Sequence, residues 1–163
     1  MPTEVFDGQT AFNLVVAFGA HGRVQLGAVA DVIRRHYGNI VSLGGAPLAL
    51  QVIQVPVFHG YALSVALEFE EPVAQSVLAQ ALAGIYVHIV PDVSAFPGNV
   101  QAVEEDDVQM LVRPALGAEK DELASRARRY WLWVVADNLK FAAKNAIACA
   151  SELNRLRPRG KVQ

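Results

Sequence analysis

The stretch WLWVVADNLKFAAKNAIACASEL, residues 131–153, decides the expected fold because a strand pattern runs directly into a helix pattern. The apolar run from Tyr130 to Val135 predicts a strand. Asp137 is a residue type that caps helices, and it stands where the pattern changes. One face of the helix that follows is predicted to be apolar and consists of Leu139, Ala142, Ala143, Ala146, Ala150 and Leu153.

Working outward from this stretch, the remaining pattern predicts an α+β fold. Helical spacing of apolar residues predicts helices over 24–37 and over 72–84, the second with Pro72 in its first turn. Residues 91–107 are expected to form a loop, and 114–128 a polar, exposed segment. Further strands are expected over 48–57, 63–69, 86–90 and 108–112. Such an order favours one mixed β-sheet with helices packed on one face.

Composition limits the domain count and the classes of partner. The 163 residues are expected to form a single domain, 1–163. A net charge of −2 argues against nucleic acid, and the absence of a long apolar run or leader argues against a membrane. The lone Cys149 fits a reducing cytoplasm. Hydrophobic residues make up 53% and charged residues 18%, so either the core is unusually full or a partner covers apolar surface.

Two segments carry a family resemblance, VIQVPVFHGYALSVALEFEEPV at 52–73 and the stretch at 131–153, together with TAFNLV at 10–15. They resemble the C-terminal substrate and dimerisation domain of aspartate-semialdehyde dehydrogenases. This resemblance implies a fold like the C-terminal domain of glyceraldehyde-3-phosphate dehydrogenase. It also implies that one sheet face forms a homodimer while the other side contributes to the substrate site.

The family's chemistry needs a cysteine thiolate and NADP, and the resemblance assigns both to a nucleotide-binding half. No glycine-rich phosphate loop follows a strand in this sequence, so no nucleotide-binding domain and no cofactor are expected. The family's carboxylate-binding arginine aligns with Gln54, and its acid/base histidine aligns with Tyr61. Neither replacement can do that work at neutral pH, so both are relict substrate-site positions and no catalytic residue is assigned. Cys149 is expected to be a buried structural thiol on a small-residue helix.

Several other features have two interpretations. His59 is either a displaced acid/base partner of Tyr61 or a turn residue. The acidic run at 104–107 lacks the spacing of a calcium loop, and the four histidines lack ligand spacing, so no metal site is expected. Trp131 and Trp133 point the same way from one strand and are either core or dimer interface.

The leading hypothesis is a non-catalytic homodimerising domain that resembles the catalytically silent paralogues of the family. The alternative is a C-terminal fragment of an NADP-dependent semialdehyde dehydrogenase, which needs a separate nucleotide-binding chain for activity. A third hypothesis, a small-ligand sensor, has no residue that singles it out.

Overall fold

The structure is a computed structural model, and it describes residues 9–18, 22–41, 45–91, 97–115 and 126–157. The chain divides into two compact units, Met1–Phe58 and His59–Gln163.

The first unit contains helix α1, Leu26–Ile40, with Leu26 and Ala30 buried. The predicted helix over 24–37 is therefore confirmed. Two side chains of α1 hold the segment that follows it. The hydroxyl of Tyr37 donates to the carbonyl of Ala46 at 2.7 Å, and the guanidinium of Arg34 donates to the carbonyl of Leu50 at 2.8 Å.

The buried strand predicted over 48–57 is wrong. In the described residues this segment forms one isolated antiparallel bridge, between Gln54 and Val15, and its side chains are half-buried or exposed. Pro56 has no backbone N–H and interrupts any ladder just beyond the bridge. Branched side chains alone do not make a strand without a neighbour to pair with.

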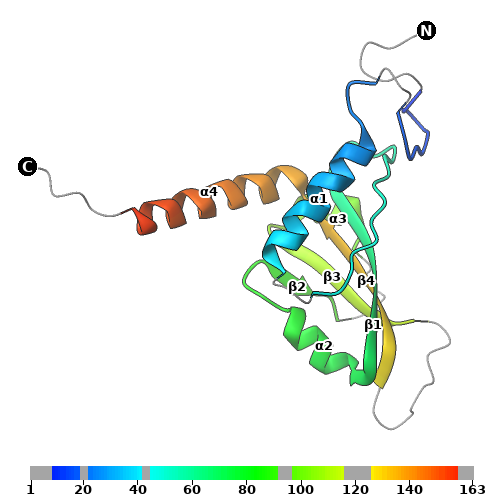
Figure 1. Cartoon of the computed structure of the whole chain (residues 1–163), viewed down its shortest axis with the longest axis vertical. Helices are drawn as coiled ribbons and strands as arrows, with labels where there is room; N and C mark the ends of the chain where they lie inside the picture. Colours follow the sequence, from blue (N-terminus) through cyan, green and yellow to red (C-terminus); the bar gives the residue numbers. More distant parts are fainter. Residues whose placement is uncertain (1–8, 19–21, 42–44, 92–96, 116–125, 158–163) are drawn as a thin grey trace, which may run out of the picture. The chain divides into compact units, whose positions relative to one another are not determined.

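The second unit is built on a mixed sheet with four strands among the described residues, in the order β1-β4-β3-β2 (Figure 1). The strands are β1 Tyr61–Ala74, β2 Val87–Ile89, β3 Val108–Pro114 and β4 Arg126–Ala136. β4 pairs antiparallel with both β1 and β3, whereas β2 and β3 are parallel. The α+β fold and the mixed sheet are thus confirmed, and all four of these strands were expected from the sequence.

The unit has helices α2 Gln75–Leu82, α3 Asn99–Glu104 and α4 Asn138–Leu156 in its described parts. Pro72 is not in α2 as expected. It belongs to β1, where the register against β4 shifts between Glu68 and Val73. Because β1 is an edge strand of the described sheet, the missing N–H of Pro72 is tolerated there.

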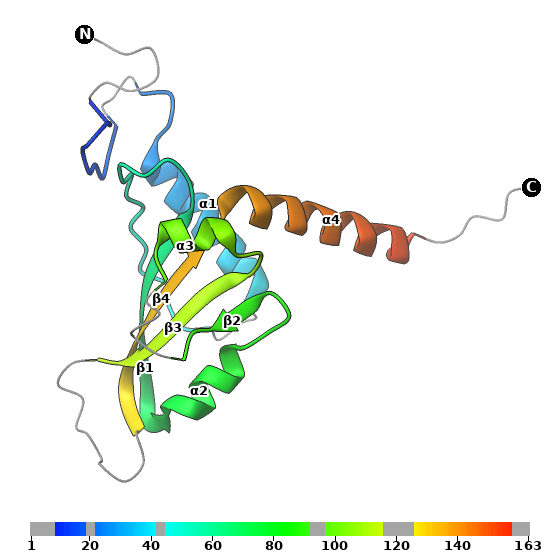
Figure 2. The same cartoon turned by 180° about the vertical axis from the view of Figure 1, so that it is seen from behind.

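Helix α3 interrupts the segment expected to be a loop, 91–107, and lies against β4 (Figure 2). Its start is held by the side chain of Gln101, whose Oε1 accepts from the N–H of Gly98 at 3.1 Å. Ala102 is fully buried and anchors the helix. The predicted polar segment 114–128 is described only at its ends, because 116–125 lie outside the described residues.

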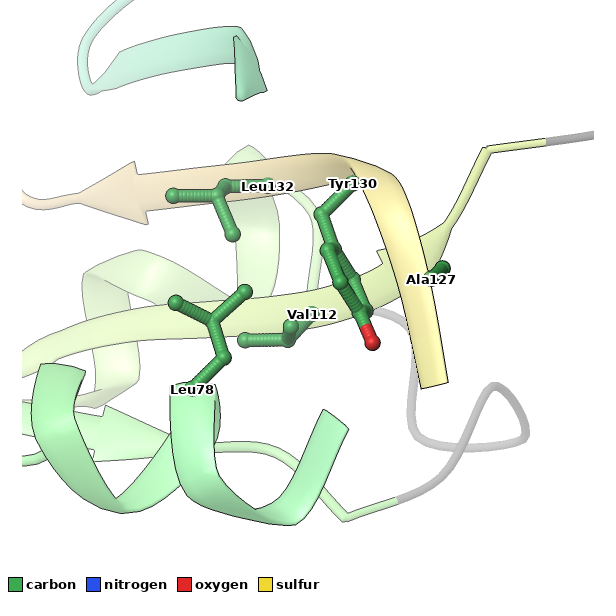
Figure 3. Close-up of a cluster of buried hydrophobic side chains, with 5 residues drawn as sticks. All are labelled: Leu78, Val112, Ala127, Tyr130 and Leu132. Atoms are coloured by element: carbon green, nitrogen blue, oxygen red, sulfur yellow. The ribbon is translucent and has the colours of Figure 1, made fainter. Parts of the chain in front are cut away.

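The core of the second unit lies where α2 packs on one face of the sheet (Figure 3). Leu78 of α2 packs with Val112, Ala127, Tyr130 and Leu132 from β3 and β4. Tyr130 is only 1% exposed, and its hydroxyl donates to the carbonyl of Val73 at 2.6 Å. Burial raises the pKa of this hydroxyl.

Candidate functional site

The two relict substrate-site positions fall in different units of the chain. Gln54, in the first unit, is half-buried, and its side-chain amide donates to the carbonyl of Val55 at 2.9 Å. Tyr61, in the second unit, is the first residue of β1, pairs across to Ala136 and is 55% exposed. Neither side chain is a cation that could hold a carboxylate.

Residues around Tyr61 are organised by the junction of β1 and α4. Gly60 has a φ of 104°, a conformation that side-chain-bearing residues rarely adopt. Its N–H donates to Oδ1 of Asn138 at 2.8 Å, which links the start of β1 to the first residue of α4. His59 is exposed and precedes this turn, which agrees with the interpretation of His59 as a turn residue.

The start of α4 is capped as the sequence predicts. One carboxylate oxygen of Asp137 accepts from the backbone N–H groups of Leu139 and Lys140 at 2.8 and 2.9 Å. These bonds lower the pKa of Asp137, chiefly the bond from Lys140, and the positive charges of Lys140 and His59 act in the same direction. The carboxylate of Asp137 therefore has a structural role as the N-cap of α4.

Two lysines of α4 bind the acidic run at 104–107. The ammonium group of Lys140 lies 3.1 Å from a carboxylate oxygen of Asp106, and that of Lys144 lies 3.1 Å from one of Asp107. The bond from Lys140 lowers the pKa of Asp106. In the part of the chain that the structure describes, no three histidine, cysteine or acidic residues are grouped as metal ligands. The run serves to attach α4.

Trp131 and Trp133 lie on the same face of β4, as expected for residues two apart in a strand. Their surroundings differ. The indole N–H of Trp133 donates to the carbonyl of Pro97 at 2.7 Å, just before α3, and this side chain is half-buried. Trp131 is 48% exposed. Trp133 is therefore partly core, whereas Trp131 is exposed on the same face of the sheet.

Trp131 is one of the residues that line a hollow of about 310 Å³, where β1 and β4 run side by side. Its lining is mainly apolar and includes Ala66. The polar part of the lining is an ion pair, in which Arg129 donates to Glu68 over 2.8 and 2.9 Å. Because Arg129 and Glu68 pair with each other, neither charge in this lining is left unpaired. The rest of the lining is apolar surface.

The expectation of a buried Cys149 is wrong, since this thiol is exposed. None of the 19 residues of α4 is buried. The reason is the orientation of the helix. Lys140 and Lys144 bind the segment that carries the acidic run, and the small residues of α4 are exposed to solvent. The thiol donates weakly to Oδ1 of Asn145 at 3.9 Å, and an amide oxygen is not a base that generates a thiolate.

In sequence and in structure, the chain is similar to part of longer proteins. No family model matches the sequence. The chain is 33% identical over 154 residues to the USG-1 protein homolog of Pseudomonas aeruginosa. This alignment covers 88% of this chain and 41% of that protein. A solved structure of a probable aspartate-semialdehyde dehydrogenase from Pseudomonas aeruginosa has a TM-score of 0.69 at 30% identity, over 93% of this chain and 44% of that chain.

The fold is therefore similar to part of an aspartate-semialdehyde dehydrogenase, and the chain spans less than half the length of either relative. Among the helices in the described ranges, none is long and apolar enough to cross a membrane.

Proposed function

We propose that this chain is a non-catalytic homodimerising domain related to aspartate-semialdehyde dehydrogenases. The observation that carries the homodimer is the open sheet face at Trp131. The exposed indole of Trp131 forms part of the lining of a mainly apolar hollow on this sheet. Two copies related by a two-fold axis could then each insert an indole into the other's hollow, which is the self-complementarity that an isologous interface requires. Large aromatic side chains in pockets dominate the binding energy of such interfaces.

The residues at the relict positions support the absence of catalysis. At Gln54 the side chain carries no charge, and its amide is already used by the backbone of Val55. At Tyr61 a phenol stands in place of an imidazole, and with a pKa near 10 it is a poor proton acceptor at neutral pH. The exposed Cys149 is bonded to an amide and not to a base. A reducing cytoplasm, in which this thiol stays reduced, is the compartment that we propose.

Sedimentation of the full chain tests the homodimer. The parent should sediment as a dimer at low micromolar concentration, and Trp131→Glu should shift it to a monomer because a charge would be placed in the centre of the contact. Tyr86→Glu is the matched control, since Tyr86 is an aromatic residue with 53% exposure and should leave the dimer intact. A parent that stays monomeric and soluble would contradict the homodimer.

The second candidate function is that of a catalytic half that works with a separate nucleotide-binding chain. The observation that favours it is coverage, since more than half of each relative has no counterpart in the aligned region. Mixing the chain with the nucleotide-binding half of an active aspartate-semialdehyde dehydrogenase distinguishes the two. Turnover in the mixture would establish the second function, whereas we expect none.

A further inference from the structure

We propose that Lys140 and Lys144 of α4 form an ionic latch, which holds helix α3 over the Trp133 end of the sheet. Opening the latch releases α3 and makes the indole of Trp133 accessible to solvent. The latch stands independently of the homodimer. Its regulatory consequence rests on the proposed function: Trp131 and Trp133 share one face of β4, so an open latch enlarges the apolar surface that a second copy can cover.

Lys140 binds the end of α3 with its side chain. Its ammonium group donates to the carbonyl of Val103 at 3.1 Å and to that of Glu105 at 3.4 Å. The same group lies 3.1 Å from a carboxylate oxygen of Asp106. An ammonium group has three N–H donors, so these oxygen atoms use its hydrogen-bonding capacity at this one place.

Lys144 binds the residues that follow α3. Its ammonium group donates to the carbonyl of Asp106 at 2.6 Å and lies 3.1 Å from a carboxylate oxygen of Asp107. Because residues four apart lie on the same side of a helix, Lys140 and Lys144 reach this segment together. The segment between α3 and β3 is thus bound to α4 through both backbone and side-chain oxygens.

The end of α3 needs such donors. The last carbonyls of a helix have no partner inside it, and they carry the negative end of the helix dipole. Val103 is in the last turn of α3 and Glu105 is its C-cap, so Lys140 supplies a cation where one is favourable. With six residues, α3 is far shorter than the roughly 12–15 residues that an isolated helix needs in water. Its stability therefore comes from contacts with other parts of the unit.

Apolar packing of α3 is small. Ala102 is the buried residue of this helix, while Val100 is 74% exposed. A buried methyl group removes little apolar surface from water compared with a buried leucine or phenylalanine side chain. The polar bonds from the two lysines are therefore a large share of what holds α3 in place.

The segment that leads into α3 reaches the sheet at Trp133. The indole N–H of Trp133 donates to the carbonyl of Pro97 at 2.7 Å, directly before the N-cap residue Gly98. α3 itself lies against β4, the strand that carries both tryptophans (Figure 2). Trp133 is half-buried beside this segment, whereas Trp131, on the same face of β4, is 48% exposed. Release of α3 thus changes the surroundings of Trp133.

The latch is accessible to ions from solvent. The side chains of Lys140 and Lys144 are 39% and 37% exposed. Ion pairs with such access weaken as salt is added. The start of α4 is held separately, by the cap at Asp137 and by the bond between Gly60 and Asn138. Opening the latch therefore frees α3 without detaching the start of α4.

Quenching of a single tryptophan tests the latch in the full chain. Trp131→Phe leaves Trp133 as the one tryptophan of the sequence. In this background, Lys140→Met with Lys144→Met removes both charges and keeps the aliphatic parts of the side chains. This double methionine variant should raise acrylamide quenching of Trp133 about twofold, because local opening exposes the indole.

A charge variant elsewhere on α4 is the matched control. Arg155→Met also removes a cation from α4, but its partner, Glu152, belongs to the same helix. It should leave the quenching of Trp133 at the parent value.

Salt separates a latch from a contact that serves only to support the fold. Between about 0.05 and about 1 M NaCl the Debye length falls to about 3 Å, so quenching of Trp133 should rise in the Trp131→Phe parent. In the double methionine variant, quenching should be high at low salt and change little.

Hydrogen exchange locates the opening. The amide of Ala102 donates to the carbonyl of Gly98 at 3.0 Å, and its exchange should be at least about tenfold faster in the double methionine variant. The amide of Val90 donates to the carbonyl of Met110 at 2.8 Å and should stay protected, which also shows that the variant is folded. For a double variant that loses protection at both amides, the salt series on the Trp131→Phe parent decides.

Two results would overturn the latch: equal quenching of Trp133 in the parent and in a folded double methionine variant, or quenching in the parent that does not depend on salt. Sedimentation with Trp131 present tests the regulatory consequence. The two methionine substitutions should lower the dissociation constant of the dimer at least about tenfold, because a second large aromatic side chain joins the interface. An unchanged or higher constant contradicts the regulation alone. A parent that is monomeric throughout contradicts the proposed homodimer, and the quenching result still decides on the latch.

Discussion

The backbone N–H of Gly60 donates a hydrogen bond of 2.8 Å to Oδ1 of Asn138, 78 residues further along the chain. This bond joins the start of β1 to the start of α4. A Cβ at residue 60 would lie 3.4 Å from Nδ2 of Asn99 and 3.5 Å from the carbonyl oxygen of Ala136, and the φ of 104° would strain it.

Gly60→Ala should therefore lower the free energy of unfolding by about 1–2 kcal/mol, because the backbone conformation is unfavourable for alanine. Urea denaturation measures it. Gly84→Ala is the control, since a Cβ there meets nothing within 4 Å and no positive φ is involved. Equal effects of the two substitutions would show that the conformation of Gly60 is not needed.

Asp137 gives the fold a dependence on pH. Because its pKa is lowered in the folded chain, the ionised carboxylate is the form that folding favours. Its contribution is present above the unfolded pKa of about 4 and is lost as the pH falls through the folded pKa. Asp137→Asn keeps an acceptor oxygen but does not titrate. The Tm of the parent should exceed that of the variant at pH 7, and the difference should close as the pH falls below about 4.

The core at Leu78 should be sensitive to truncation. Leu78→Ala removes a buried side chain that packs on β3 and β4, and it should cost about 2–5 kcal/mol of unfolding free energy. Val77→Ala, one residue earlier and 57% exposed, should cost less than about 0.5 kcal/mol. Thermal or urea denaturation compares them, and similar losses would mean that α2 does not pack as described.

Restoring the family's residues should not restore chemistry. The double variant Gln54→Arg and Tyr61→His should show no reduction of NADP with aspartate semialdehyde and phosphate, because the family resemblance assigns the nucleophilic cysteine and the NADP site to a nucleotide-binding half. Tyr61→His alone should change the Tm little, since this side chain is more than half exposed. Measurable turnover by the purified double variant would contradict the non-catalytic assignment.

The sequence predicted where the strands lie because each contains an apolar or alternating run, but β1 and β4 extend beyond the expected 63–69 and 130–135. The cap at Asp137 was equally visible, since a capping residue stood directly before a helical pattern. The strand expected over 48–57 failed because composition does not reveal whether a neighbour is available for pairing. Helix α3 was missed because its anchor is one small residue, Ala102, in a short polar segment.

The candidate surfaces were only half predictable. Alternation along β4 places Trp131 and Trp133 on one face, but which one is covered depends on Pro97, 36 residues before Trp133. Likewise, helical spacing identified an apolar side of α4 but not its direction. That direction is set by where Lys140 and Lys144 bind, through contacts 35 to 38 residues away in sequence.

The unequal surroundings of the two tryptophans also give the chain an internal optical reporter. The sequence contains two tryptophans, so its indole fluorescence is the sum of one exposed and one half-buried emitter. Covering the exposed ring with a second copy should shift its emission to shorter wavelength and reduce quenching by acrylamide, while the emission of Trp133 changes little. Dilution of the unmodified protein would then report on the sheet face at Trp131 alone, without a label.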